Sequence, residues 1–361
     1  MSSSKQILIP KIQKCLTSES RSSIFKLLLQ LSEEEQLLKN YIHSAIKSVK
    51  IVKGWDYNQR NHEKSRLGFA GIENLGCICY MISMLQQFYN IQTFRYGILE
   101  ADDQKQPIYT KNPEIDDNLL HQLQYMYGFL DLTERKAFNP TNFCYSFKDM
   151  DGNPTNISLQ QDAHEFINVL LGRLENLLKD THQKYLAQSI FGGKFCSKLI
   201  CSEGCNTVKK NYEDFYDITL GLKDSKTVFE SLEKLMKGDT ISDYFCSTCQ
   251  KKVKLFKQTC ISELPNILIL HLQRIVFNYD TFMNEKVNSR LEFPEWINME
   301  PYTEEGIELR KNNKPDPKEF EHGHSQFYYQ YKLVGVVLHY GTADVGHYYS
   351  LINTVRGSNH K

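Results

Sequence analysis

The first candidate for chemistry in this sequence is a cysteine at the start of a predicted helix. After Cys79, apolar residues recur at i, i+3, i+4 and i+7, the spacing of a helix that buries one face: Met81, Met84, Leu85 and Phe88. The helix dipole and unpaired amide groups at such a start favour thiolate over thiol, and thiolate is the reactive form. Asn74, five residues earlier, could donate its side-chain amide to a developing oxyanion. The alternative is a buried core cysteine, because free cysteine packs as a small hydrophobe.

A histidine near the other end of the sequence could serve as the base for this thiol. Residues 331–352 alternate, are rich in β-branched and aromatic side chains, and are interrupted by a turn at Gly341–Gly346, which predicts a hairpin. His347 lies at the lip of that hairpin, 268 residues after Cys79, so the two groups could be distant in sequence and adjacent in space. Imidazole titrates near neutral pH and can accept the thiol proton, then return it to a leaving amine. His339, on the first strand, is the rival base.

Four cysteines form a second constellation. Cys201 and Cys205 have three residues between them, and Cys246 and Cys249 have two, which is close to the knuckle spacing of a tetrahedral zinc site. The step of 41 residues from Cys205 to Cys246 exceeds that of the usual zinc ribbon. Four unligated thiols therefore remain the alternative. Cys196, in a strand-like run, is expected to pack in the core.

The segments that must position these groups are both helical and extended. The clearest helix runs from about Gln161 to Lys179, and Asp162 stands at its start, where the helix dipole favours a carboxylate whatever else it does. Residues 266–278 indicate a buried strand. Residues 302–326 are polar and indicate a variable surface insertion whose charges are solvated.

Residues 1–66 are expected to form an N-terminal helical extension and linker. Residues 22–31 carry a helical stripe, and Ser32–Glu35 indicates a capping box that opens a second helix. Residues 53–66 are polar, as in a linker. A single large domain should then occupy residues 67–361.

Composition excludes some classes of function. The 361 residues are 41% apolar, enough for a large core, and the 43 basic residues balance the 43 acidic ones. No block of like charge indicates binding to nucleic acid, and no segment resembles a secretory signal or a membrane span. The ten cysteines are therefore expected to be thiols or metal ligands in the cytoplasm or nucleus, rather than disulfides.

Six blocks, in order, resemble those of the ubiquitin-specific proteases. They are Gly71–Met81, similar to the Cys box of that family; Gln160–Phe166, similar to its Gln-Gln-Asp-Ala helix start; Phe191–Gly193, similar to the entry to its fingers; Leu264–Arg274 and Leu291–Pro294, similar to its later core strands; and Tyr331–Ile352, similar to its His box. The resemblance covers roughly residues 68–352. Six ordered blocks are far more specific than any single motif.

This resemblance implies an α+β fold, a papain-like cysteine protease with a helical thumb, an antiparallel β palm and β fingers at about residues 191–260. Cys79 would lie on the thumb and His347 on the palm, facing each other across a cleft. Asn74 would stabilise the oxyanion. The implied partners are ubiquitin and ubiquitylated proteins, and catalysis would need no cofactor.

The resemblance also implies roles outside the catalytic pair. Gln161, Asp162 and Tyr348 would line the groove for the extended tail of ubiquitin, and for Asp162 this role can coexist with capping. The four cysteines would hold a structural Zn²⁺ at the tip of the fingers. These assignments come from the resemblance and not from the helix pattern.

Two departures from the family pattern bear on activity. Ile82 stands where most relatives have Asn. The Asp or Asn that orients the family's histidine lies in a Trp-Tyr-x-Phe-Asp-Asp-like block, and the 14 residues after His347 contain no such block. Asn353 and Asn359 are the only amides there, and neither is assigned the role, so we expect the C-terminal end of the domain to be incomplete.

Three functions remain open at this point. An active deubiquitinase is favoured, because thiol, imidazole and oxyanion amide are all present. A catalytically impaired ubiquitin-binding module of the same fold is the alternative. A zinc-stabilised interaction domain unrelated to ubiquitin is the third.

Overall fold

The computed structural model describes residues 63–102, 118–149, 151–201, 205, 207–311 and 324–354, together with isolated positions between 17 and 44. In the first predicted helix, the described positions 22–24, 26, 27 and 30 are helical; the capping box at Ser32–Glu35 and most of the linker lie outside the described residues. Among the helices of the described ranges, none is long and apolar enough to cross a membrane.

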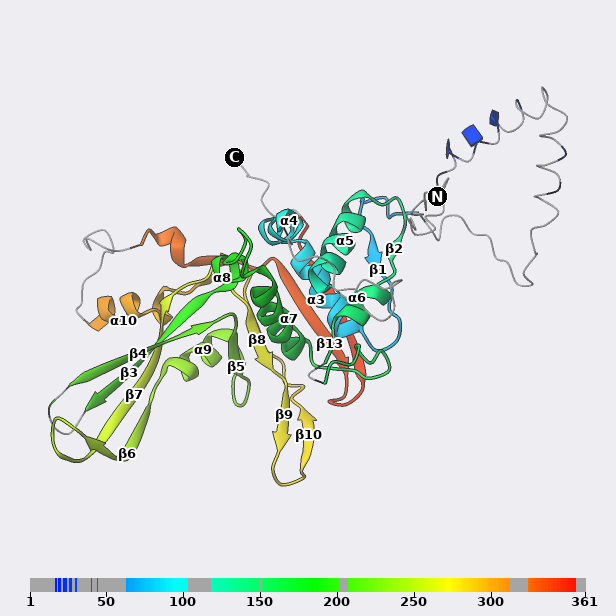
Figure 1. Ribbon diagram of the computed structural model, residues 1–361. Coiled ribbons are helices and arrows are strands. Elements are labelled where there is room, and N and C mark those ends of the chain that lie inside the picture. The colour runs from blue at the N-terminus through cyan, green and yellow to red at the C-terminus, as the bar shows by residue number, and fades with distance from the viewer. Residues whose placement is uncertain are drawn as a thin grey trace.

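Six helices build the body that carries Cys79 (Figure 1). They are α3 (Cys79–Tyr89), α4 (Gln92–Glu100), α5 (Leu119–Leu132), α6 (Thr141–Ser146), α7 (Ala163–Leu178) and α8 (Leu186–Phe191). The helices predicted after Cys79 and from about Gln161 are both present. Nine of the 11 residues of α3 are buried, not one face only, because α4, α7 and the C-terminal hairpin all pack on it.

The fingers are a four-stranded antiparallel sheet in the order β4-β3-β7-β6, which extends away from the helical body (Figure 1). Its strands are β3 (Gly193–Cys201), β4 (Val208–Phe215), β6 (Asp239–Cys246) and β7 (Lys251–Glu263). Cys196 of β3 pairs with Cys260 of β7, and both are fully buried, so Cys196 packs in the core as predicted.

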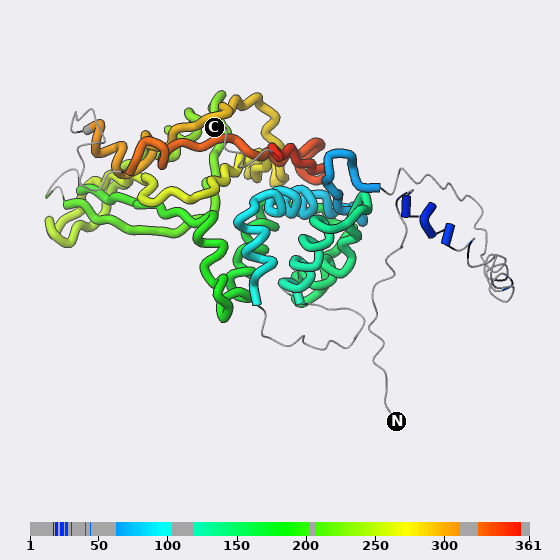
Figure 2. The backbone as a smooth tube through the Cα atoms, turned by 90° about the horizontal axis from the view of Figure 1, so that it is seen from above, coloured from blue at the N-terminus to red at the C-terminus, as the bar shows by residue number. Residues whose placement is uncertain are grey.

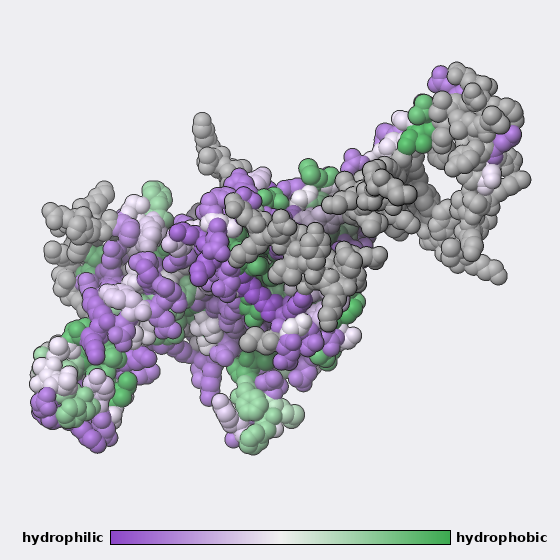
Figure 3. Space-filling model, viewed as in Figure 1, coloured by the Kyte–Doolittle hydropathy of each residue, from purple (hydrophilic) through white to green (hydrophobic). Residues whose placement is uncertain are grey.

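Shorter strands connect the fingers to the helical body. β5 (Ile218–Gly221) pairs in parallel with β8 (Leu270–Gln273); β9 (Ile275–Asn278) pairs with β10 (Met283–Lys286), and β11 (Trp296–Asn298) with β12 (Gln330–Lys332), both antiparallel. The single strand predicted over residues 266–278 is therefore two short strands, β8 and β9. Helix α9 (Val228–Met236) contributes to a second core beside β5. At the tip of the β9–β10 hairpin, Tyr279 and Phe282 are 80% and 78% exposed, within an apolar patch visible in Figure 3.

The predicted C-terminal hairpin is present and lies against the helical body, in red in Figure 2. Its first strand begins at Gly335 and not at residue 331, because Gln330–Lys332 form β12 and pair with β11. Strand β13 (Gly335–Gly341) pairs with β14 (Gly346–Ile352), and the register sets Tyr340 opposite His347 and His339 opposite Tyr348. Near the start of the domain, β1 (Gly71–Ile72) pairs in parallel with β2 (Ala137–Phe138) and leads the chain toward Cys79. The described part of the chain thus has the expected α+β character, although two of its strand pairs are parallel.

The prediction that residues 302–326 are a solvated insertion is wrong for its first part. Residues 304–311 form helix α10 (Glu304–Lys311), which packs on β7. Glu304 Oε1 lies 2.9 Å from Lys198 Nζ and 2.6 Å from Lys210 Nζ, and Lys198 is only 6% exposed. A charge pattern within one segment does not reveal partners on distant strands.

Candidate active site

Cys79 is the first residue of α3, and its thiol lies against the edge of β14. The backbone N–H of Tyr348 donates to Cys79 Sγ, with 3.4 Å between nitrogen and sulfur. The cysteine is 5% exposed, so its sulfur is largely covered. The N-cap residue, Ile78, makes no side-chain hydrogen bond to the first turn of α3, so no side chain competes for the amide groups beside the thiol.

His347 is the residue before Tyr348, so the fold brings it to within one residue of the Cys79 contact. Successive side chains of a strand point to opposite faces. Tyr348 is buried toward α3, and His347 therefore lies on the other, exposed face of β14. Within the described residues, no hydrogen bond to the His347 imidazole is formed.

His339, the rival base, is engaged in other contacts. Its ring packs against that of Tyr348, tilted by 35° with 4.4 Å between centroids, and its Nε2 lies 3.1 Å from Gln160 Nε2. Burial, and then the positive charge of Lys286, lower the pKa of His339. A ring whose neutral form is favoured, and whose Nε2 already contacts Gln160, is a poorer candidate for general base than His347.

Asn74 is exposed in the turn before α3. Its Oδ1 accepts the backbone N–H of Gly76 at 3.3 Å. This bond leaves the side-chain NH₂ group as the donor, which is the group an oxyanion would need. The structure places Asn74 in the loop that leads to Cys79 but does not bond the two residues to each other.

The three residues expected in the tail groove lie around the Cys79 contact. Asp162 is the N-cap of α7: its Oδ1 accepts the backbone N–H groups of His164 and Glu165 at 2.7 and 3.2 Å. Gln161 Oε1 accepts the hydroxyl of Tyr80, the residue after Cys79, at 3.1 Å. Burial, and then the charge of Asp162, raise the pKa of Tyr348 to about 12. Oδ1 makes both capping bonds, so the expected tail-binding role of Asp162 would fall to its other oxygen, Oδ2.

A histidine pair beside Asp162 was not predicted from the sequence. The rings of His164 and His271 stack with 3.8 Å between centroids and 8° between planes. His164 Nε2 lies 2.9 Å from Asp217 Oδ1, and His271 Nδ1 lies 3.1 Å from Thr219 Oγ1. The hydrogen bond with Asp217 raises the pKa of His164, whereas burial, and then the charge of His164, lower that of His271.

Asp162, His164 and His271 bring possible metal-ligand atoms within 4.8 Å of one another. A metal ion binds an imidazole lone pair that lies in the plane of the ring. Two parallel, stacked rings cannot both direct such a lone pair at one ion. The geometry therefore favours a hydrogen-bonded pair over a metal site.

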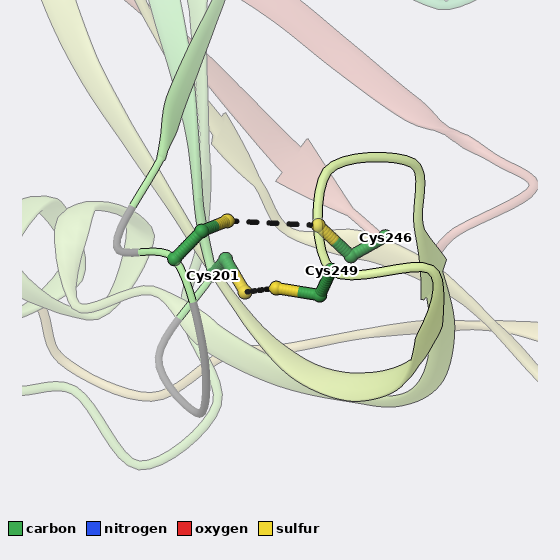
Figure 4. A group of neighbouring side chains, drawn as sticks. Cys201, Cys246 and Cys249 are labelled. Atoms are coloured by element: carbon green, nitrogen blue, oxygen red, sulfur yellow. Dashed lines mark hydrogen bonds between the residues drawn. The ribbon is translucent and has the colours of Figure 1, made fainter.

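The four predicted cysteines do converge. Cys201 at the end of β3 faces Cys249, and Cys246 at the end of β6 faces Cys205, with 3.8 Å between the sulfurs in each pair (Figure 4). All four sulfurs lie within 4.8 Å of one another. A metal with Zn–S bonds of about 2.3 Å in a tetrahedron sets sulfurs about 3.8 Å apart, whereas a disulfide needs about 2.05 Å. The nine cysteines in the described ranges are free thiols, and this cluster could hold a metal ion.

Hydrogen bonds at this cluster favour thiolate. The hydroxyl of Thr207 and a backbone N–H lower the pKa of Cys205 to about 6, and the backbone N–H of Cys249 lowers that of Cys246. The neighbouring thiol of Cys205 raises the pKa of Cys249 to about 12. Without a cation the cluster cannot hold four thiolates, because like charges at this distance oppose one another.

Sequence reasoning missed Gln160, which bonds to both strands of the β13–β14 hairpin. Gln160 opens the Gln160–Phe166 block and lies two residues before the N-cap Asp162, but neither feature indicates a contact with the C-terminal hairpin. The histidine pair gave no signal at all, because His164 and His271 are separated by more than a hundred residues and belong to a helix and a strand.

Comparisons with known proteins identify the family to which this sequence is similar. The sequence model described as "Ubiquitin carboxyl-terminal hydrolase" matches residues 70–360. The protein named ubiquitin carboxyl-terminal hydrolase 34 from Homo sapiens is 33% identical over 350 residues, which are 95% of this chain and 10% of that protein. Ubiquitin carboxyl-terminal hydrolase puf from Drosophila melanogaster is 32% identical over 368 residues, covering 94% of this chain and 9% of that protein.

A third relative, ubiquitin carboxyl-terminal hydrolase 24 from Homo sapiens, is 29% identical over 364 residues, which cover 95% of this chain and 14% of that protein. This chain therefore spans between 9% and 14% of the length of these relatives.

Proposed function

Because this chain belongs to the ubiquitin carboxyl-terminal hydrolase family, we propose that it is a cysteine protease that removes ubiquitin from proteins or from ubiquitin chains. The observation that carries the proposal is the contact of 3.4 Å between Cys79 Sγ and the backbone nitrogen of Tyr348, the residue after His347. It joins the first residue of α3 to the strand that carries the candidate base.

The proposed reaction is acyl transfer through a thioester. The Cys79 thiolate attacks the carbonyl carbon of ubiquitin's C-terminal glycine, and the carbonyl oxygen becomes an oxyanion. The lysine amine of the substrate leaves with a proton donated by His347. Water, deprotonated by the same imidazole, then hydrolyses the thioester and releases the carboxylate of ubiquitin.

Amide groups near the thiol would stabilise the oxyanion. The start of α3 offers backbone N–H groups that no side chain caps, and Asn74 offers a side-chain NH₂ whose oxygen is already bonded to Gly76. Removing one such donor typically lowers kcat by ~10²–10³. The tail of ubiquitin would enter past Tyr348 and Oδ2 of Asp162.

A thiol-reactive ubiquitin derivative tests the assignment. Ubiquitin with an electrophile at its C-terminus should label the wild-type chain and the Cys77→Ala variant, but not Cys79→Ala. Cys77 is the matched control because it lies two residues away and is partly exposed. Binding of ubiquitin without labelling would support the catalytically impaired module instead, and no binding at all would refute both.

For the four-cysteine cluster, we propose a structural Zn²⁺ at the tip of the fingers. Support comes from the donor set and from the sulfur separations of 3.8 Å, which match a tetrahedral site. The metal would supply charge neutralisation and would join the β3–β4 and β6–β7 turns. Free thiols also fit the cytoplasm or nucleus expected from the sequence.

Metal content measures this directly. Purified protein should carry about one equivalent of zinc per chain, and the double substitution of Cys246 and Cys249 by serine should abolish it. Cys77→Ser serves as the control, since that thiol lies outside the cluster. An unchanged metal content in the double variant would refute the site.

A further inference from the structure

Gln160 lies at the entry to α7 and bridges the two strands of the β13–β14 hairpin. Its Oε1 accepts the backbone N–H of Gly346 at 2.8 Å, and its Nε2 lies 3.1 Å from His339 Nε2. Gly346 and His339 lie on opposite strands beside the turn, and Gly346 immediately precedes His347. A single amide group therefore contacts both strands next to the candidate base.

The direction of these two bonds fixes the protonation of His339. A backbone N–H can only donate, so Gly346 requires the oxygen of the Gln160 amide on its side. The NH₂ group of Gln160 must then face His339, and His339 Nε2 must accept. The proton of the neutral His339 ring is consequently on Nδ1.

Other contacts hold the same turn in place. Lys286 Nζ donates to the carbonyl oxygens of His339 and Gly341 at 2.9 and 3.0 Å. The His339 ring packs against the ring of Tyr348, whose backbone N–H donates to Cys79 Sγ. His339 Nδ1 is buried and has no partner among the described residues. A buried N–H without an acceptor costs free energy, and such groups persist where the surroundings over-determine the geometry.

We propose that Gln160 and His339 are positioning residues that fix the Gly341–Gly346 turn and so hold the backbone of His347 next to the Cys79–Tyr348 contact. This inference rests on the proposed function. None of the described residues forms a hydrogen bond to the His347 imidazole. In the described part of the chain, the position of His347 is therefore fixed through its backbone. His339 thereby has a different role from that of a rival base.

Substitutions of Gln160 separate positioning from binding. Gln160→Ala removes both contacts, and kcat should fall by ~10- to 100-fold, since a misplacement of about 1 Å can cost that much. The affinity for ubiquitin, measured in a Cys79→Ala background, should stay within about twofold. Gln160→Glu keeps an acceptor for Gly346 and should restore kcat to within about threefold of wild type. Gln188→Ala, an exposed glutamine of α8, is the matched control.

The imidazole ¹⁵N and ¹H signals of His339, assigned by their loss in His339→Gln, give a readout that a merely structural role would not move. In the wild-type chain Nε2 should carry no proton at neutral pH, and in Gln160→Glu it should carry one, because a carboxylate can only accept. A protonated Nε2 in the wild type, or a Gln160→Ala variant that loses affinity with kcat unchanged, would overturn the proposal. A wild-type chain without turnover would refute the proposed function. The Nε2 signal would still show whether Gln160 contacts both Gly346 and His339 as proposed. If Gln160→Ala fails to fold, the Gln160→Glu variant tests the positioning role instead, through its kcat and through the proton on Nε2 of His339.

Discussion

Replacing Gly346 by alanine tests how closely the catalytic hairpin is packed. A Cβ atom at this position would lie 2.2 Å from His339 Nε2 and 2.3 Å from the carbonyl oxygen of Tyr340. Ordinary contact of a Cβ begins near 3.4 Å, so the His339 ring or the strand must retreat by about 1.2 Å. The Tyr340 oxygen belongs to the backbone and cannot rotate away. A shift of about 1 Å next to His347 should lower kcat by ~10².

Hydrolysis of a fluorogenic C-terminal amide of ubiquitin measures this effect. In Gly346→Ala, kcat should fall by ~10², while ubiquitin should bind a Gly346→Ala, Cys79→Ala double variant within about threefold of Cys79→Ala alone. Gly172→Ala is the matched control, because its added Cβ would meet no atom within 4 Å beyond its chain neighbours and the nearby backbone of its own helix. That helical substitution should raise the free energy of unfolding by up to ~1 kcal/mol without changing kcat. An unchanged kcat in a folded Gly346→Ala chain would refute the reasoning.

Three further predictions concern stability. Asp217→Asn should remove the charged hydrogen bond to His164, worth ~2 kcal/mol. The raised pKa of His164 stabilises the fold below the unfolded value near 6.5. Burial alone would raise the pKa of Asp217, but the bonds and charges of His164, Thr219 and His271 together lower it, and this stabilises the fold above about pH 4. The loss in urea-unfolding free energy should therefore be largest near pH 5–6 and shrink by pH 9; a loss independent of pH would contradict this. Lys198→Met should cost ~3 kcal/mol in the same assay, because Glu304 is left partly buried with one cation fewer, and a loss under ~1 kcal/mol would show the pair to be solvated. Ser350→Ala should cost ~1 kcal/mol by removing its bond of 2.6 Å to the carbonyl of Ser83, and an unchanged melting temperature would count against that bond.

Local patterns in the sequence predicted the elements that carry the site. Helix α7 follows from its apolar period, and its start follows from Asp162, whose capping bonds the structure contains. The β13–β14 hairpin follows from alternation around the Gly341–Gly346 turn. The convergence of four cysteines followed from their paired spacing. The helix and the hairpin were each predicted from a pattern within about twenty residues. The cysteine cluster was predicted from a residue type that has few functions when it occurs in closely spaced pairs.

Contacts between distant segments were not predictable in this way. The partners of Glu304 lie on finger strands, and those of Gln160 lie on the C-terminal hairpin. Glutamine and glutamate are common on protein surfaces, so neither residue type predicts a contact with a buried group on a distant segment. Such pairs become visible only when the topology brings the segments together.

The face of α3 that meets β14 illustrates the same limit. The apolar stripe of α3 predicted one buried face, yet Ser83 and Gln87 are also buried, at 4% and 8% exposure. With Cys79 they recur at i, i+4 and i+8, which places them in one row along the helix. Each member of this row contacts β14: Cys79 Sγ accepts from Tyr348, the carbonyl of Ser83 accepts from Ser350, and Gln87 Nε2 donates to a β14 carbonyl at 3.1 Å.

The geometry of the two elements explains why this polar row fits. Four helical residues advance the chain by about 6 Å, and two strand residues advance it by about 6.6 Å, so successive turns of α3 meet successive inward positions of β14. The strand offers edge N–H and C=O groups that require partners when buried. The side chains of Cys79 and Gln87 supply such partners, and between them the backbone carbonyl of Ser83 accepts the hydroxyl of Ser350. The same edge that fixes α3 on the hairpin therefore sets Cys79 within one residue of His347.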